Sequence, residues 1–186
     1  MPKNIRQQPI YISTGDPETV NDVTLQYPGQ LGMRATIKQP SGPGTPGSES
    51  YRDKTYQLVQ TDSSMGTAPY LGAVAWWADK TAYKVTTDPT KLGRGRIAGV
   101  FQNAITPGNY GFIQTQGPAS VKLVDAPTSA PTANSGQFVI PSATAAKADT
   151  LAAGAAATYP VLGVVAGSLN LGDNTIVVDL DVPETV

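Results

Sequence analysis

Residues 96–115 read RIAGVFQNAITPGNYGFIQT, and this stretch decides the fold class. Two apolar segments, Arg96–Ala104 and Tyr110–Thr115, flank the turn residues Thr106-Pro107-Gly108-Asn109. Proline presets a turn value of φ and glycine tolerates positive φ, so this order of residues favours a chain reversal. The stretch therefore predicts an antiparallel β-hairpin.

A similar arrangement recurs near the C-terminal end of the sequence. The segment Val161–Val165 (VLGVV) is followed by turn residues at Leu171–Asn174 and then by Thr175–Val182 (TIVVDLDV), which alternates apolar and polar side chains. Strict alternation is typical of a strand with one buried face. Two hairpins of this kind suit one small β-barrel or β-sandwich.

The rest of the chain also favours strands over helices. Its 19 glycines and 16 prolines are spread throughout the sequence, where they interrupt helices and permit many turns. The best helical candidate, Ala143–Ala157, lacks large side chains to anchor a helix, so at most one short helical turn is expected there. The fold class predicted is all-β. Further strands are expected at Thr55–Gln60, Gly72–Trp77, Thr81–Thr87 and Gln137–Ile140.

The sequence divides near residue 51. Residues 1–50 hold short apolar clusters separated by turn residues, and Pro40–Ser50 (PSGPGTPGSES) is too rich in proline, glycine and serine to pack. We interpret residues 1–50 as an extended N-terminal arm and linker that gains order against a partner, and residues 51–186 as the compact β-barrel or β-sandwich domain.

Composition excludes several function classes. There is no cysteine and no histidine, so thiolate nucleophiles, disulfides, imidazole bases and Cys/His zinc sites are excluded. The 13 basic residues are balanced by 14 acidic ones, which argues against a nucleic-acid partner. The uncharged stretch Thr150–Gly172 is broken by glycine and proline, so a membrane span is not predicted either.

Candidate catalytic and metal-binding carboxylates are sparse. Asp173 precedes Asn174 in an ordinary turn pattern, and Asp179 and Asp181 alternate along one strand face without a third ligand at a known spacing. No phosphate-binding loop or nucleophile elbow is present in the sequence. We therefore predict no enzymatic activity, no cofactor and no metal.

Residues 74–123 resemble a segment of the capsid decoration, or cement, proteins of tailed bacteriophages. The resemblance rests on the aromatic strand before Asp79-Lys80, on Tyr83-Lys84-Val85-Thr86, on Ala98-Gly99-Val100 and above all on Thr106–Gln114 (TPGNYGFIQ). The C-terminal VLGVVAG and VVDLD are similar to the same group, whereas the first fifty residues match poorly. The resemblance implies a compact β-barrel or β-sandwich, commonly trimeric, that binds the major capsid protein. It also implies synthesis in the host cytoplasm and a final location on the capsid surface of the virion.

Interface candidates come from the arm, from one strand and from one loop. If Trp76 and Trp77 lie in a strand, they point to opposite faces, so one indole can lie in the core and the other can be exposed, where it could anchor an interface. The clustering of these two residues with Tyr83 also predicts self-association. The pair Arg94 and Arg96 could contact acidic capsid residues or could form a solvated turn. The candidate interface residues are Ile10, Tyr11, Ile12, Tyr27, Leu31, Met33, Trp76, Trp77, Arg94 and Arg96.

Three function classes remain open from the sequence. The first is a virion structural protein that binds and stabilises the outer surface of the phage capsid. The second is a receptor-binding or glycan-binding appendage of the phage head or tail, which could use exposed tryptophan and tyrosine to stack on sugars. The third, a small glycan-cleaving enzyme, needs two carboxylates across one cleft, and no spacing in the sequence places them so.

Overall fold

The computed structural model of the chain describes residues 17–23, 31–37, 52–90, 97–132, 136–152, 154–157 and 159–182. Within these ranges every regular element is a β-strand and no helix occurs. The all-β prediction is thus confirmed. The strands are β1 (Arg34–Ile37), β2 (Lys54–Thr61), β3 (Val74–Asp79), β4 (Lys84–Thr86), β5 (Ile97–Phe101), β6 (Tyr110–Lys122), β7 (Phe138–Pro141), β8 (Ala148–Leu151), β9 (Gly163–Val165) and β10 (Thr175–Asp181).

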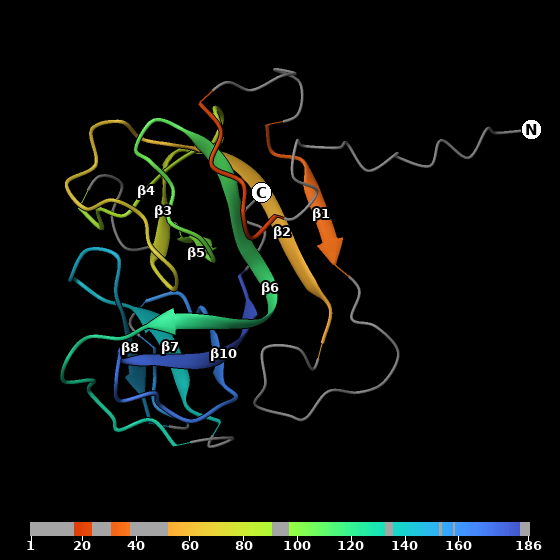
Figure 1. The fold of residues 1–186 in the computed structure, drawn as a ribbon. Helices are drawn as coiled ribbons and strands as arrows, with labels where there is room; N and C mark the ends of the chain where they lie inside the picture. Colours follow the sequence, from red (N-terminus) through yellow and green to blue (C-terminus); the bar gives the residue numbers. More distant parts are fainter. Residues whose placement is uncertain are drawn as a thin grey trace, which may run out of the picture.

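Five of these strands close into a barrel, which occupies the upper part of the molecule in Figure 1. β2 pairs with β4, β4 with β3, β3 with β5, β5 with β6, and β6 again with β2. The β2–β4 pair is parallel and the other four pairs are antiparallel. A closed ring of this kind satisfies the backbone hydrogen bonds that an open sheet would leave at its edges.

Strand β6 continues beyond the barrel and carries a second sheet. Its second half pairs with β10, from Gln116 opposite Asp181 to Lys122 opposite Thr175. β10 then pairs with β9, β9 with β7, and β7 with β8. A single parallel β-bridge between Leu123, just after β6, and Ala148 places β8 next to the end of β6. Figure 1 shows β6 descending through the barrel and then turning across the lower sheet.

The turn in β6 depends on Gly117. Its φ of +85° is a conformation that residues with a side chain rarely adopt. A Cβ on Gly117 would lie 2.1 Å from the carbonyl oxygen of Asp53, just before β2. A glycine is therefore required where the two backbones approach each other and β6 changes direction.

Two hydrophobic clusters lie on opposite faces of β3. The first fills the barrel, because it takes a buried side chain from each of the five strands, namely Val59, Trp77, Val85, Phe101 and Ile113. The second lies between the barrel and the second sheet. It includes Trp76, Val100, Val121, Leu162, Val178 and Leu180. Alternation along β3 thus places the two neighbouring indoles in different clusters.

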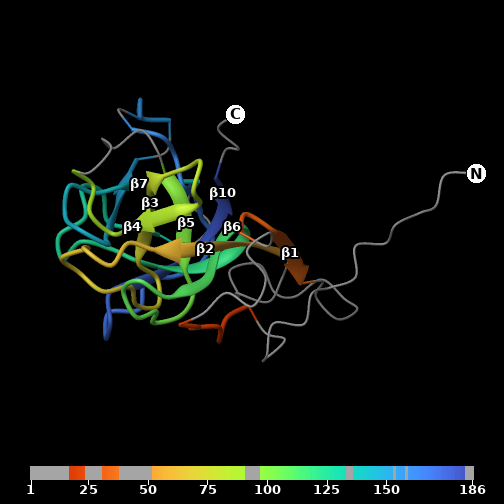
Figure 2. The same cartoon turned by 90° about the horizontal axis from the view of Figure 1, so that it is seen from above.

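Described parts of the first fifty residues pack on the outside of the barrel. Val20 is buried with Tyr56, Leu58 and Phe112, and Ala35 and Ile37 of β1 pack against the same cluster. β1 pairs antiparallel with β2, as Figure 2 shows from above. Deleting residues 1–40 would therefore remove part of the barrel's covering. The predicted linker Pro40–Ser50 lies outside the described residues.

Both predicted hairpins are present. β5 pairs with β6 across the turn in which the N–H of Asn109 donates to the carbonyl of Thr106 at 2.9 Å, and β9 pairs with β10. The helical turn considered for Ala143–Ala157 does not occur in its described part. β8 lies there instead and pairs with β7, and its residues Ala148 and Thr150 are buried. A short alanine-rich helix would bury little apolar surface and would be only marginally stable.

Candidate functional site

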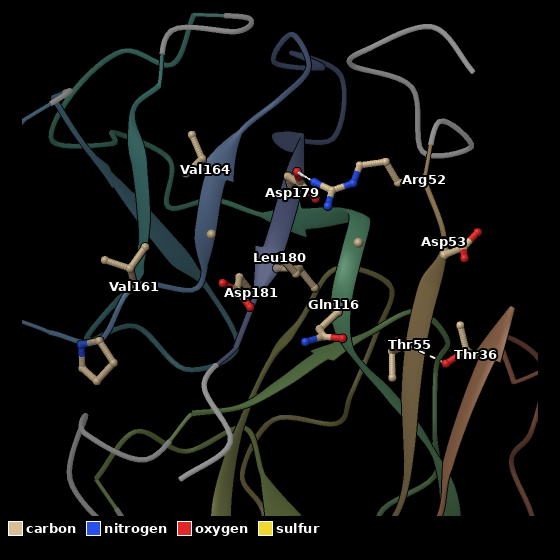
Figure 3. A pocket seen from close by; sticks show the side chains of 13 residues that line it. Thr36, Arg52, Asp53, Thr55, Gln116, Val161, Val164, Asp179, Leu180 and Asp181 are labelled. Carbon is tan, nitrogen blue, oxygen red and sulfur yellow. Dashed lines mark hydrogen bonds and ion pairs between the residues drawn. The ribbon is translucent and has the colours of Figure 1, made fainter. Parts of the chain in front are cut away.

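A large concave site lies where the barrel meets the second sheet. This junction cleft has a volume of about 1060 Å³. Figure 3 shows polar side chains from β1, from β2 and from the residues just before β2 on one wall. Apolar side chains from β9 and from the segment before it form the other wall, and β6 and β10 lie between the two. Its lining comprises Thr36, Arg52, Asp53, Thr55, Gln116, Gly117, Pro160, Val161, Gly163, Val164, Asp179, Leu180 and Asp181.

An ion pair spans the junction cleft. The guanidinium of Arg52, just before β2, donates a hydrogen bond to the carboxylate of Asp179 on β10, as the dashed line in Figure 3 marks. The Arg52 side chain stays 59% exposed, so the pair is screened by solvent and contributes little to stability. Asp53 and Asp181 line the same cleft, which therefore carries more negative than positive charge.

The smaller site lies at one end of the barrel. This mouth pocket has a volume of about 260 Å³. Two of its residues, Trp77 on β3 and Ala98 on β5, belong to the hydrophobic cluster that fills the barrel. Gln57 on β2 and Thr115 on β6 are buried polar residues that line the same pocket. The other lining residues are Gly32, Arg34, Lys80, Tyr83, Ile97 and Val182.

An aromatic pair forms one wall of the mouth pocket. The rings of Trp77 and Tyr83 meet edge to face, with centroids 6.2 Å apart and planes at 70°. Tyr83 has a φ of +50°, which is rare for an aromatic residue. Its ring lies directly over Gly32, where a Cβ would come within 2.2 Å of a ring carbon. The barrel thus holds an energetically unfavourable backbone conformation at this position.

A cluster of polar side chains connects the N-terminal segment to β2. The carboxylate of Glu18 accepts hydrogen bonds from the hydroxyl of Tyr56 and, at 2.8 Å, from Nζ of Lys54. Burial raises the pKa of Glu18, but these hydrogen bonds and the charge of Lys54 together hold the net pKa below its usual value. Since Lys54 and Tyr56 are buried, this cluster is structural rather than a site for a ligand.

The expectation of one exposed tryptophan was wrong. Trp76 and Trp77 are only 2% and 5% exposed. Alternation does point them to opposite faces, but β3 is covered on both faces, by the barrel interior and by the second sheet. The sequence pattern of a strand indicates its faces and does not indicate how many of them are covered.

The other predicted interface residues have separate outcomes. Leu31 and Met33 are half-buried on either side of Gly32, so their segment is brought next to Trp77 at the mouth pocket. Ile10, Tyr11, Ile12, Tyr27, Arg94 and Arg96 lie outside the described residues. Sequence reasoning did not select Arg34, Gln57, Lys80 or Thr115 as candidate site residues. They are far apart in the sequence, and only barrel closure brings them together.

Among the described residues, no three acidic, cysteine or histidine side chains gather in a way that could hold a metal ion. The same part of the chain contains no helix long and apolar enough to cross a bilayer. Comparison of the chain with protein-family models, with curated proteins and with solved structures finds no match.

Proposed function

We propose that the chain is a capsid decoration protein of a tailed bacteriophage, a structural protein that binds the outer surface of the phage head and stabilises it. The resemblance at residues 74–123 suggests this function. That segment corresponds to β3, β4, β5 and β6, which are four of the five barrel strands. The motifs behind the resemblance are therefore those that build the barrel. We propose that the barrel itself is what this chain has in common with decoration proteins.

The observation that carries the proposal is the way the N-terminal region joins the barrel. β1 adds to β2 by antiparallel backbone pairing over Arg34–Ile37, and its side chains are half-buried or exposed. Strand addition of this kind provides attachment through backbone hydrogen bonds and selectivity through alternate side chains. Extended segments of the same region could bind the major capsid protein in the same manner.

Residues 1–16 are the natural segment to test. They include Ile5, Ile10, Tyr11 and Ile12, and they precede the first described contacts with the barrel. Removing them leaves Val20 and β1 in place, so the barrel keeps its own covering. We propose that this segment adds apolar and backbone contacts on the capsid, with the barrel as the rigid body that it fixes there.

The test is co-sedimentation of the purified chain with expanded capsid shells of the phage that encodes it. The full chain is expected to sediment with the shells, and the chain lacking residues 1–16 is expected to bind much more weakly while keeping the same circular dichroism spectrum. Equal binding by both would place attachment in the barrel. If the full chain binds host-envelope glycans and not shells, it is a receptor-binding appendage instead.

Self-association is the second part of the proposal. Decoration proteins that the chain resembles are commonly trimers, and a capsid surface presents repeated sites that favour symmetric oligomers. Analytical ultracentrifugation over a range of concentrations, together with the copy number on shells, would test it. A monomer at every concentration and on the shell would contradict it.

A further inference from the structure

The order in which the described strands pair begins at β1 and ends at β8. At the β8 end the strand edge is covered. The carbonyl of Ala148 accepts a hydrogen bond from the N–H of Val124 at 2.9 Å, and the carboxylate of Asp149 accepts one from the N–H of Thr150 at 2.7 Å. Covering of this kind prevents another chain from pairing with an edge strand.

At the β1 end the pairing with β2 shows which backbone groups point outward. The N–H of Leu58 donates to the carbonyl of Met33, and the carbonyl of Leu58 accepts from the N–H of Gly32, both at 2.9 Å. In an antiparallel pair every second residue points its backbone groups at the neighbouring strand. Since the register of β1 and β2 has no bulge, the residues of β1 that point to β2 are Ala35 and Ile37.

Thr36 lies between these two residues, so its N–H and carbonyl point to the open edge of β1. In the described part of the chain neither group has a hydrogen-bond partner, and the residue is exposed. The sequence of β1, RATI, contains no proline or lysine of the kind that protects edge strands. An outward N–H and carbonyl on such a strand are the groups to which an added strand binds.

The side chains of β1 determine which strand fits beside it. Ala35 and Ile37 pack against the apolar cluster on the outside of the barrel but remain only half-buried. Thr36 lies on the other face, where its hydroxyl is 3.4 Å from that of Thr55 in the junction cleft. A fitting strand therefore has small apolar side chains on one face and a neutral polar one on the other, which is the pattern of β1 itself.

A second copy of β1 meets this requirement when a two-fold axis passes between the two Thr36 residues. Each Thr36 then donates its N–H to the carbonyl of the other, and Ala35 of each copy lies opposite Ile37 of the other. The two Arg34 residues are four positions apart along the strands, or about 13 Å by the usual rise per residue, so like charges do not face each other. The same surface thus serves both copies.

We propose that two copies of the chain associate by antiparallel pairing of their β1 strands at Thr36. This deepens the self-association part of the proposed function by naming its surface. The paired segment is short and buries less than the roughly 1,000 Å² of a stable interface, so the dimer dissociates readily in dilute solution. Copies attached side by side on a shell would pair at a higher effective concentration.

Disulfide cross-linking tests the register, because the chain contains no cysteine of its own. Opposed residues of a hydrogen-bonded antiparallel pair have Cα atoms about 5.5 Å apart, a distance that a disulfide spans. Under mild oxidation, Thr36→Cys should form a disulfide-linked dimer at least ten times faster than Leu171→Cys. Leu171 is 85% exposed and lies outside β1, so it reports random collisions. Equal rates for the two variants would overturn the proposal.

A second pair of variants tests the backbone hydrogen bond. Thr36→Pro removes the outward N–H and leaves the hydrogen bonds to β2 in place, because an edge strand tolerates proline on its open side. Thr36→Val keeps the N–H and is the matched control. The rotational correlation time of the full ¹⁵N-labelled chain, measured by NMR relaxation, should rise with protein concentration for the wild type and Thr36→Val and stay at the monomer value for Thr36→Pro. An equal rise in Thr36→Pro would contradict the proposal.

The dispersion of the NMR spectrum shows whether Thr36→Pro is folded, and if it is not, the cross-linking of Thr36→Cys decides alone. Co-sedimentation separates this proposal from capsid attachment. A wild type that fails to bind shells would contradict the capsid proposal only, since cross-linking is measured without shells. Loss of shell binding in Thr36→Pro with an unchanged rise in correlation time would assign the β1 edge to a strand of the capsid protein and overturn the pairing of two copies.

Discussion

Asp22 and Tyr110 exchange both of their backbone hydrogen bonds, with N–H to carbonyl distances of 2.9 Å from Asp22 and 2.8 Å from Tyr110. The neighbouring Asn21 strengthens this connection, because its Oδ1 accepts from the N–H of Thr106 at 3.1 Å and from Nδ2 of Asn109 at 2.9 Å. The N-terminal segment thus holds both the start of β6 and the turn before it.

Val20 should contribute to stability although it lies in the predicted arm. Its side chain is 3% exposed among Tyr56, Leu58 and Phe112, so Val20→Ala should lower the free energy of unfolding by about 2 kcal/mol. Val23 is 77% exposed on the same segment, so Val23→Ala is the matched control and should have almost no effect. Urea denaturation of both variants measures the difference. Equal stability of the two would mean that residues 17–23 detach from the barrel in solution.

Glu18 should make stability depend on pH in the acidic range. Its pKa in the folded chain lies below the ordinary value of 4.5, so ionised Glu18 stabilises the fold above that value. This contribution is lost as the pH falls below about 4.5 and through the folded pKa, because the unfolded chain takes up the proton first.

Thermal denaturation between neutral pH and pH 3 should therefore show a smaller acid-induced loss of stability in Glu18→Gln than in the wild type. Tyr56→Phe removes a hydrogen bond to the carboxylate and leaves the one from Lys54, so it should produce an intermediate dependence. An identical pH dependence in all three proteins would show that Glu18 is not held by Lys54 and Tyr56 in solution.

Alanine substitutions at Gly117 and Gly136 should distinguish two contributions to the loss of folding free energy, an unfavourable φ and a steric clash. Both have positive φ, +85° and +68°, but a Cβ on Gly117 would collide with the carbonyl of Asp53, and one on Gly136 would meet nothing within 4 Å. Gly136→Ala should cost about 1 kcal/mol. Gly117→Ala should cost several times more, because the clashing atom belongs to the backbone. Chemical denaturation would measure both, and similar costs would show that β6 can bend without this close approach.

Trp76 should tolerate phenylalanine better than its burial suggests. Its Nε1–H is buried and has no hydrogen-bond partner in the described structure, which is unfavourable for the folded state. Trp76→Phe removes this donor and keeps an aromatic ring, so its cost should be about 1 kcal/mol, against about 3–5 kcal/mol for Trp76→Ala. If phenylalanine were as costly as alanine, the indole N–H would have a partner, such as a buried water molecule.

The sequence predicted the local elements well because their signals are local. The hairpin of β5 and β6 and that of β9 and β10 follow from turn residues that act within a few positions. β6 was expected to end at Thr115 but continues to Lys122 through Gly117 and Pro118, residues that ordinarily interrupt a strand. Here they permit the bend that connects the barrel to the second sheet, and only the tertiary structure explains them.

The mouth pocket was beyond sequence reasoning for a similar reason. Gln57 and Thr115 look like ordinary polar positions of two alternating strands. They line the same pocket only because β2 pairs with β6 when the barrel closes. The positive φ of Tyr83 has no signature in its residue type, since tyrosine does not favour that conformation. Pocket residues contributed by distant strands therefore could not be recognised before the topology was known.

The continuity of β6 also determines how the molecule should come apart. Amide protons of Phe112 and Ile113 lie in the barrel half of this strand, and those of Ala119 and Val121 lie in the other half. Neither half can lose its neighbours without exposing the shared strand, so opening of one part should propagate to the other. Native-state hydrogen exchange should then report the same opening free energy for both halves, as one cooperative unit.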